Sequence, residues 1–551
     1  MKNTFKYIAA VALSVLALSS CIKETIPEGG TVTAKQLTES ASALNASIAG
    51  IPAQFATAYP IFGSDNQLEP DCGLPQFHFE FCEIMGDIFV QGTNSGYDWF
   101  RRWNINQNMG ANTWLAQVPW YTLFSFVKSA NDVIGAIGAD PETNEQKAYS
   151  GMARAIRAME YLMLMTMYEP VENPYTDVSD VLGLTVPLID ENFDAANSNN
   201  NPRVSHEVLV KFIQNDLDLA QEYLADYAQT NKMFPTIAVV YGLKARLAMI
   251  EHNWKDAETF ARKAIDLSKC TPVNQAQWED PNTGFCDASA NPNFMWYARY
   301  SVENMSNLCN WTGWAAAESD WGYGSLCYFG INKWMYDRLN DTDFRKHTWL
   351  DPDKSLYYPY QSVRGKEWIE AESTPKYTSL KFRCKGGNWE DYTIGGVTDM
   401  PIMRVEEMYF IEIEAKGMQD LAAGEEALVS FMTKYRDSGY AYDATKNISR
   451  GKVQQGASYL TPAQYVFAEE VLFQKRVEFW MEGMATFADY KRIQPGSYQW
   501  YDGSNAPGLD AHLNCDYVKP NCNYVIPQNE IDANQAIKNN PDPSGTVKTI
   551  N

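Results

Sequence analysis

The sequence predicts a mostly α-helical protein built from helix pairs, with one long loop-rich segment. Apolar residues recur at helical spacing in several stretches of the chain, and one helix–turn–helix resembles a tetratricopeptide repeat. Between about 270 and 400 this periodicity fades, and Gly, Pro, Asn and Asp interrupt short apolar runs. We therefore expect a helical scaffold that carries a region of irregular loops.

One helix is predicted from a stripe of methionines that ends before Pro170. The apolar positions of this stripe follow one another every three or four residues (Met152, Ile156, Met159, Met163 and Met167). Methionine stripes of this kind are more typical of a core than of a ligand site. We expect this helix to be buried.

The tetratricopeptide-like hairpin follows further along the chain. Thr236 is placed to cap a helix whose apolar face contains four residues (Val240, Leu243, Leu247 and Ile250). The next helix begins at Asn253-Trp254, and its small residues allow a neighbour to approach closely (Ala257, Ala261 and Ala264). Because such repeats bury their faces by stacking, we expect further pairs at 111–136 with 148–168 and at 403–418 with 464–490.

The N-terminus has the pattern of a secretory signal over residues 1–20. Lys2 and Lys6 precede an apolar stretch, Ile8 to Leu18, that is too short to span a bilayer, and small residues follow it. The run Leu18-Ser19-Ser20-Cys21 resembles a bacterial lipobox, in which Cys21 would carry the lipid. The alternative is an ordinary signal peptide with a chance cysteine. We expect a polar tether over 21–40 and a single folded domain over 41–551.

Composition excludes several classes of protein. The chain is 45% hydrophobic and 13% aromatic, which argues against disorder. Its formal charge is −23, and loss of Lys2 and Lys6 with the signal makes it −25. An acidic surface of this kind argues against a nucleic-acid partner and against a basic membrane-docking face.

Cysteine and histidine patterns predict no metal, cofactor or catalytic residue. The chain has ten cysteines, and a lipidated Cys21 leaves nine, so at least one of these is free or pairs outside the chain. No Cys-x-x-Cys pair occurs, and the five histidines are scattered, so a zinc site and a Cys–His nucleophile lack support. Cys515 and Cys522 are either a loop disulfide or a pair of free thiols.

Tryptophans concentrate in the loop-rich segment. Nine of the sixteen lie between about 270 and 400 (Trp278, Trp296, Trp311, Trp314, Trp321, Trp334, Trp349, Trp368 and Trp389). A second aromatic cluster, from Tyr97 to Trp103, lies in the loop-like stretch 91–108. Because loops carry function more often than scaffolds do, these are candidate binding regions.

Several motifs together resemble the SusD/RagB family of surface lipoproteins. The motifs in the first third of the chain are Met85-Gly86-Asp87, Ala130-Asn131-Asp132-Val133-Ile134, Ala153-Arg154-Ala155 with Arg157-Ala158 and Tyr161, and Tyr168-Glu169-Pro170. The later motifs are Arg404 to Ile411 with Glu414-Ala415, then Arg476, Glu478, Glu482-Gly483, Asp489 and Arg492 of a last long helix, and finally Ile526-Pro527, Glu530-Ile531 and Asn534. The chain departs from the family pattern at Gln474, Ala485 and Val525.

The charged residues of these motifs are interpreted as structural. Glu478 and Glu482 lie one turn apart on one face, so Arg404 or Arg476 would reach them only across a helix interface. Paired acids are also what glycoside hydrolysis needs. With 68 acidic residues, however, such pairs occur by chance throughout the chain.

The resemblance implies a SusD-like helical scaffold in the outer membrane, facing the cell exterior, that binds a polysaccharide or oligosaccharide without cutting it. It implies a SusC-like TonB-dependent transporter as the partner. It places the ligand site by region, on the loop after the acidic turn and on the loop-rich segment (Asn94, Tyr97, Trp99, Arg101, Trp103, Trp296, Tyr297, Trp311, Trp314, Trp321 and Tyr323). Sugars stack their C–H faces on such rings, and polar side chains take the hydroxyls.

Three alternatives remain open. A RagB-like protein would bind peptides, because aromatic rings serve peptides too. A surface glycoside hydrolase would need a preorganised acid pair, and the sequence has no recognisable one. A plain repeat scaffold for protein partners leaves the concentration of tryptophans unexplained.

Overall fold

The computed structural model describes residues 41–91, 99–100, 107–228, 230–324, 326–354, 362–445, 457–497, 499–506 and 514–547. The fold is mostly α-helical, as predicted, and its strands form three small two-stranded sheets among these residues. No helix in the described ranges is both long enough and apolar enough to cross a membrane.

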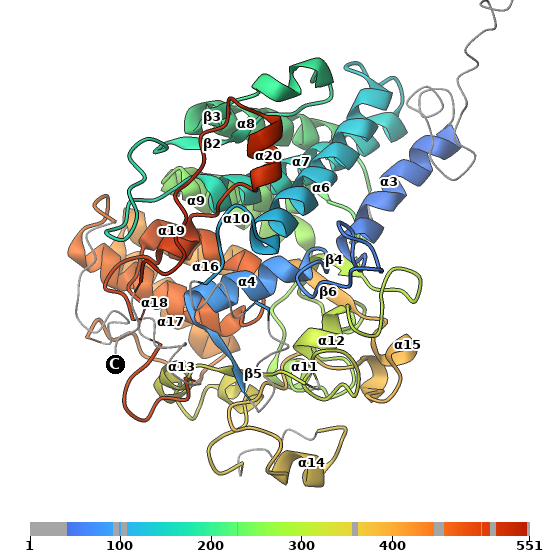
Figure 1. Ribbon diagram of the computed structural model, residues 1–551. Helices are drawn as coiled ribbons and strands as arrows, with labels where there is room; N and C mark the ends of the chain where they lie inside the picture. Colours follow the sequence, from blue (N-terminus) through green and yellow to red (C-terminus); the bar gives the residue numbers. More distant parts are fainter. Residues whose placement is uncertain are drawn as a thin grey trace, which may run out of the picture.

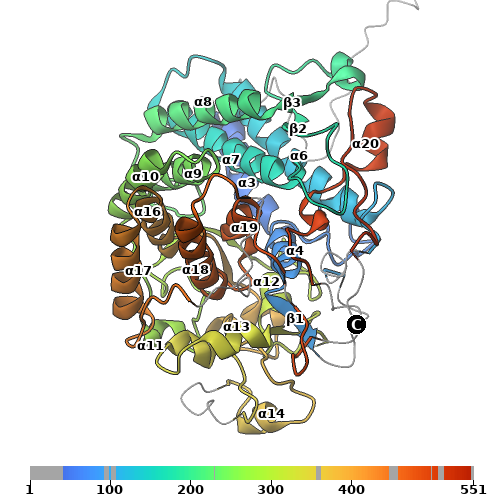
Figure 2. The same cartoon turned by 90° about the vertical axis from the view of Figure 1, so that its left-hand side faces the viewer.

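The long helices stack one after another into a layered array. They are α6 (Trp114–Ile137), α7 (Asn144–Tyr168), α8 (His206–Leu224), α9 (Ile237–Ile250), α10 (Trp254–Ser268), α16 (Val405–Gln419) and α17 (Leu421–Tyr435). Each of them packs on the next, and α10 bridges to α16 across the intervening loop-rich segment. Figure 2 shows α8, α10, α16 and α17 following one another down one side of the molecule. The predicted pairing of 111–136 with 148–168 is confirmed as α6 against α7.

The tetratricopeptide-like hairpin is formed by α9 and α10. The Thr236 hydroxyl accepts the Val239 N–H and caps α9, and the Asn253 side chain caps α10 in the same way. Ala257, Ala261 and Ala264 are fully buried where α10 meets its neighbours. The prediction for this hairpin is confirmed.

The predicted last long helix over 464–490 is wrong. Helix α18 (Pro462–Glu478) ends before a turn in which Met481 has a φ of 59°, and α19 (Phe487–Ile493) begins after the short η5 (Gly483–Ala485). The turn packs against α4 (Pro75–Met85), so closely that a Cβ on Gly483 would lie 2.7 Å from the His78 carbonyl oxygen. The helix therefore breaks where distant chain segments approach it, and α16 packs on α18 and separately contacts α19, through Glu414 and Arg492.

The segment from 270 to 400 is loop-rich, as predicted. Its short elements are α11 (Gln275–Trp278), β4 (Phe294–Arg299), α12 (Trp311–Ala315), β5 (Tyr328–Ile331), α13 (Lys333–Arg338), η3 (Phe344–Thr348), α14 (Lys366–Glu370), η4 (Lys385–Gly387), α15 (Tyr392–Gly395) and β6 (Asp399–Arg404). Strand β4 pairs antiparallel with β6, and β5 pairs antiparallel with β1 (Ile88–Gln91). Figure 1 shows α12, α14 and α15 on the lower side of the molecule, away from α8 at the top.

The remaining elements line the periphery of the helical array. They are α3 (Ala41–Phe55), β2 (Leu184–Pro187), η2 (Ala195–Asn200), β3 (Arg203–Ser205), η7 (Pro520–Cys522) and α20 (Gln528–Ala533). Strands β2 and β3 pair antiparallel and pack beside α7 and α8.

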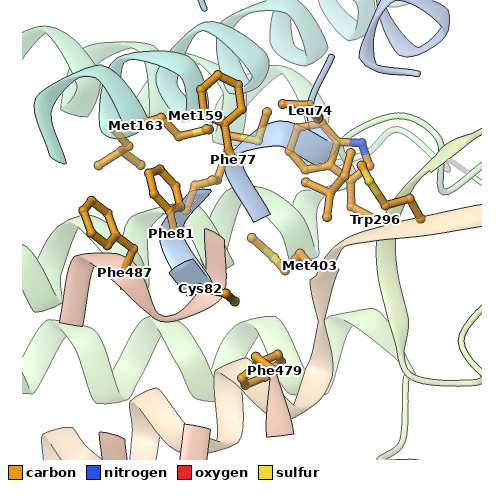
Figure 3. Close-up of a cluster of buried hydrophobic side chains, with 14 of the residues drawn as sticks. Leu74, Phe77, Phe81, Cys82, Met159, Met163, Trp296, Met403, Phe479 and Phe487 are labelled. Atoms are coloured by element: carbon orange, nitrogen blue, oxygen red, sulfur yellow. The ribbon is translucent and has the colours of Figure 1, made fainter. Parts of the chain in front are cut away.

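Helix α4 lies at the centre of the core, and every one of its residues is buried. Figure 3 shows Phe77 and Phe81 of this helix between the methionine stripe of α7 and residues of distant segments such as Phe487. The Phe81 and Phe487 rings stack with their centroids 4.2 Å apart. The predicted burial of the methionine stripe is confirmed, because each of its members is at most 8% exposed.

A central charge network joins the helical array to the loop-rich segment. We define it as four basic and four acidic buried residues (Arg345, Lys381, Arg404 and Arg436 with Asp343, Glu406, Glu478 and Glu482). Arg404 Nη1 lies 3.0 Å from Glu478 Oε1, and its Nε lies 2.8 Å from Glu482 Oε2. Of the two arginines that the sequence offered as partners of these acids, Arg404 is the one that pairs with both. Arg476 instead pairs with Asp87 of the acidic turn, Nε to Oδ1 at 2.6 Å.

Within the network, basic partners keep the Glu478 carboxylate ionised. Burial opposes the charge on Glu478, but Arg436, Arg404 and Arg345 outweigh it and hold the pKa of Glu478 below its usual range. Burial lowers the pKa of Lys381 to about 8, although the nearby Glu482 carboxylate opposes this shift. Glu478 is therefore a structural anion that is paired with buried arginines.

Removal of one charge from this network is expected to be strongly destabilising. The substitution Arg436→Met deprives Glu478 and Glu406 of a buried partner, and we expect a loss of about 3–5 kcal/mol in the free energy of unfolding. The matched control is Lys128→Met, which removes an ion pair with Asp132 whose side chains are 74% and 51% exposed. That change is expected to alter stability by less than about 1 kcal/mol. Urea unfolding measures both, and equal effects would contradict the structural role of the network.

The stability of the protein is expected to depend on pH through His206. His206 bridges Glu169 after α7 and Glu251 after α9, at 2.9 and 2.6 Å, and the hydrogen bonds that its ring donates to both carboxylates raise its pKa to about 10. Because the folded pKa exceeds the unfolded value of 6.5, this stabilisation is fully present below pH 6.5 and is lost as the pH rises through about 10. The difference in unfolding free energy between the wild type and His206→Gln should therefore shrink between pH 6 and pH 10. A difference that stays constant over this range would contradict the bridge.

Candidate functional site

The structure describes seven of the eleven predicted ligand-binding residues. The predicted site residues Asn94, Tyr97, Arg101 and Trp103 and the predicted lipid-bearing Cys21 lie outside the described residues. The candidate site is therefore built from Trp99 and from the loop-rich segment.

Six of the predicted rings are buried. Their exposed fractions lie between 0% and 8% (Trp296, Tyr297, Trp311, Trp314, Trp321 and Tyr323). Trp311 stacks on Phe79 of α4 with a centroid distance of 5.5 Å, and the Trp296 indole N–H donates to the Met233 carbonyl oxygen at 3.1 Å. The prediction that these rings offer their faces to a ligand is corrected, because their faces pack on protein.

The buried rings instead support aromatic side chains at the surface. Trp314 stacks on Tyr323 with centroids 4.5 Å apart, and it meets the edge of Phe100 at 4.9 Å. Trp99, next to Phe100 in sequence, is half-buried, and its ring lies 5.6 Å from that of Trp114. Trp114 is 44% exposed at the first turn of α6. We call these two residues the Trp99–Trp114 pair.

A second surface group, the Trp389 cluster, consists of Trp368, Trp389, Arg364 and Asp320. The Arg364 guanidinium lies 4.4 Å from the centroid of Trp389 and 5.5 Å from that of Trp368. Both rings are half-buried, and Asp320 is exposed with a carboxylate oxygen 3.8 Å from Arg364 Nη2. The cluster therefore presents two indoles and two charged groups on one part of the surface.

Local sequence explains how the Trp389 cluster is held. The Asp320 N–H donates to the Trp389 carbonyl oxygen at 2.8 Å, and the Trp389 ring packs beside the buried Trp321. The Asp391 side chain caps α15 by accepting the Thr393 N–H. Gly395 allows this helix to close on the loop, because a Cβ there would lie 2.8 Å from the Trp321 ring and still closer to the Asn388 carbonyl oxygen. Trp321, a predicted site residue, is thus buried and supports Trp389, which is not among the predicted site residues.

The site has the chemistry of a stacking surface. Indole faces attract the C–H faces of sugars and other flat apolar surfaces, while Arg364 and Asp320 can exchange hydrogen bonds with hydroxyl groups. Among the described residues, no group of three or more His, Cys, Asp or Glu side chains is arranged to hold a metal ion. Cys515 and Cys522 are both free thiols in this structure.

The sequence reasoning missed Trp114, Arg364, Trp368 and Trp389 as site residues. Trp368 and Trp389 belong to the nine tryptophans of the loop-rich segment, so their region was identified but their exposure was not. Trp114 follows Thr113 at a helix start, and an exposed first-turn aromatic residue is a signal that could have found it.

Comparison with solved structures identifies the class of fold. A SusD-like carbohydrate binding protein from Bacteroides vulgatus superposes with a TM-score of 0.66 at 16% identity, over 90% of this chain and 97% of that one. A putative sugar binding protein from the same organism gives 0.63 at 17% identity, over 92% and 98%. A SusD superfamily protein from Bacteroides thetaiotaomicron gives 0.63 at 14% identity, over 91% and 99%.

The chain therefore has the SusD-like fold, over nearly the whole length of each of these proteins. The fold implied by the motif resemblance is confirmed. No protein-family model matches the sequence, and a search of curated proteins gives no match.

The difference between buried supporting rings and surface rings can be tested by measuring the free energy of unfolding. We expect Trp311→Ala to lower the free energy of unfolding by about 3–5 kcal/mol, because it empties a large site in the core. We expect Trp389→Ala to lower it by about 1 kcal/mol or less, because that ring is half-buried at the surface. Urea unfolding of both variants measures the difference, and a Trp389→Ala loss as large as that of Trp311→Ala would place Trp389 in the core.

Proposed function

We propose that this protein belongs to the SusD/RagB family and binds glycan at the cell surface without cleaving it. The observation that carries the proposal is the presence of two groups of partly exposed indoles, the Trp99–Trp114 pair and the Trp389 cluster, in a fold whose solved neighbours include a protein described as SusD-like and carbohydrate binding. Several rings spread over a surface suit an extended oligosaccharide better than a compact metabolite.

Binding at this face would combine stacking with polar contacts. The Trp389 ring packs beside the buried Trp321, and Trp314 contacts Phe100, the residue that follows Trp99. Packing against Trp321 limits the rotamers of Trp389 before ligand arrives, which reduces the entropy lost on binding. Arg364 and Asp320 supply a donor and an acceptor beside the Trp389 ring.

The state of the motif acids supports a non-catalytic role. Glycoside hydrolysis needs two carboxyl groups that face the substrate, one of them able to donate a proton. Glu478 and Glu482 are fully buried, and both are paired with Arg404. These acids are therefore not placed to act on a substrate.

We further propose that residues 1–20 are a signal peptide and that a lipid on Cys21 anchors the body over 41–551 to the outer membrane through the tether over 21–40. Attachment next to a TonB-dependent transporter would make transfer of the bound glycan effectively intramolecular. A transfer of this kind requires binding and release but no chemical step.

The second candidate is a RagB-like peptide-binding protein. Arg364 and Asp320 would then contact peptide carboxylates, amines or backbone groups, and the rings would hold aromatic or proline side chains. The face is compatible with both ligand classes, so the choice rests on measured binding.

The test is a binding screen of the purified protein against panels of polysaccharides and peptides. Retardation in polysaccharide gels and heat of binding in solution report affinity, and chromatography of the same samples reports product release. We expect retardation by one class of glycan with no products. Each of Trp114→Ala, Trp368→Ala and Trp389→Ala should weaken this binding roughly tenfold, the equivalent of about 1.4 kcal/mol for a lost stacking contact.

The matched control is Tyr517→Ala, which removes a 38% exposed ring outside the loop-rich segment and should leave binding unchanged. Equal losses for the control and the site variants would contradict the placement of the site. Binding to peptides alone would favour the RagB-like function, and release of sugar products would favour a hydrolase.

A further inference from the structure

Two loops that are far apart in sequence are joined beneath the candidate site. The Ala58 N–H donates to the Asn304 carbonyl oxygen at 2.8 Å, and the Tyr59 N–H donates to the Asp71 carbonyl oxygen at the same distance. The Ser306 hydroxyl lies 3.5 Å from the Tyr59 hydroxyl. We call these segments, residues 56–74 and 300–310, the loop junction.

A pair of cysteines lies inside the loop junction. Cys309 Sγ lies 3.7 Å from the carbonyl oxygen of Asp71, the residue before Cys72, and the Cys72 and Cys309 thiols hydrogen bond to each other. Each of these residues is 2% exposed. Both are free thiols in this structure.

We propose that Cys72 and Cys309 form a disulfide in the exported protein and that this bond locks the loop junction. The proposal rests on one part of the proposed function, which is export to an oxidising compartment. It does not depend on which ligand the protein binds.

The bond forms by thiol–disulfide exchange with an oxidised thiol–disulfide oxidoreductase or with a small disulfide such as oxidised glutathione. The thiolate of Cys72 attacks one sulfur of the oxidant, which gives a mixed disulfide and releases the other oxidant sulfur as a thiol. The thiolate of Cys309 then attacks the Cys72 sulfur, the Cys72–Cys309 bond forms, and the second oxidant sulfur leaves as a thiol. Two electrons and two protons pass from the cysteines to the oxidant.

Burial determines when this reaction takes place. Burial raises the pKa of the Cys72 thiol well above its usual value, so in the folded protein little of the reactive thiolate is present. The oxidant also cannot reach a sulfur that is 2% exposed. The bond therefore forms as the loops come together during folding, and once formed it is shielded from reductant.

Other cysteines are held by different partners. The Cys515 thiol hydrogen bonds with Tyr175. Cys270 Sγ lies 3.2 Å from Lys232 Nζ and 3.4 Å from the Phe294 carbonyl oxygen. The approach of Cys309 Sγ to the peptide group before Cys72, together with the interaction of the two thiols, therefore favours Cys72 and Cys309 over the loop pair Cys515 and Cys522.

The loop junction positions both groups of surface rings. Glu69 accepts the Trp99 N–H at 3.3 Å from one side of the junction. Asn310, at the other side, caps α12 by accepting the Gly313 N–H at 2.6 Å, and it also accepts the Trp321 indole N–H at 3.4 Å. A covalent bond between Cys72 and Cys309 would fix the segment before Trp99 to the segment before Trp321.

The test maps the thiols of the full chain after export to a bacterial periplasm. Free thiols are blocked with N-ethylmaleimide under denaturing conditions, and the protein is digested without reductant. We expect one peptide pair that joins Cys72 to Cys309 and that separates on reduction. Recovery of both cysteines as blocked peptides, or of Cys515 joined to Cys522 instead, would overturn the proposal.

Stability provides a second measurement. Reduction during folding is expected to lower the thermal midpoint of the wild type by several degrees, because the bond closes a very long loop. Cys72→Ser and Cys309→Ser should each abolish this dependence on reductant, whereas the control Cys82→Ser, another buried thiol, should retain it. A reductant effect that persists in Cys72→Ser would overturn the proposal. The mapping uses the wild type alone, so its result stands even if a serine variant fails to fold or if no glycan binds.

Discussion

Eight ionised side chains in the interior of one protein are unfavourable unless every charge has a partner, and this requirement organises the whole molecule. The central charge network contains four positive and four negative groups, drawn from η3, from the loop before η4, from β6 and α16, and from the ends of α17 and α18. Arg404 is central, because it contacts Glu406, Glu478 and Glu482. The helical array and the loop-rich segment are thereby joined by interactions that neither part can satisfy alone.

The same constraint explains the division between scaffold and binding face. Long helices with periodic apolar faces stack into the array, while the loop-rich segment is held against it by the charge network and by buried aromatic rings such as Trp311. Among the described residues, the outer edge of that aromatic packing reaches the surface at places that include the Trp99–Trp114 pair and the Trp389 cluster. A surface of this kind can vary in its outermost rings without disturbing the rings beneath.

The sequence predicts those elements whose pattern lies in neighbouring residues of the chain. The α9–α10 hairpin follows from the Thr236 cap, the apolar stripe of α9 and the three alanines of α10. The sequence offered Arg404 or Arg476 as the partner of Glu478 and Glu482, and the choice of Arg404 depends on tertiary contacts. The break after α18 was missed because Gly483 is required by the approach of α4, which lies some 400 positions earlier in the chain. The candidate site is predicted by region and not by residue, since tryptophan suits both core and surface and nothing near Trp314 or Trp389 in sequence indicates which ring faces outward.

The complete burial of α4 has a consequence for how the chain reaches its native state. This early helix is enclosed by residues from the other end of the polypeptide, through the stacking of Phe81 on Phe487 and the hydrogen bond of the Tyr524 hydroxyl to Glu80 at 3.0 Å. Contacts of such high sequence separation close late and slow the search for the native topology. The helical repeats therefore cannot complete their packing one by one as the chain is synthesised, and the core is completed only after residues near 524 are available.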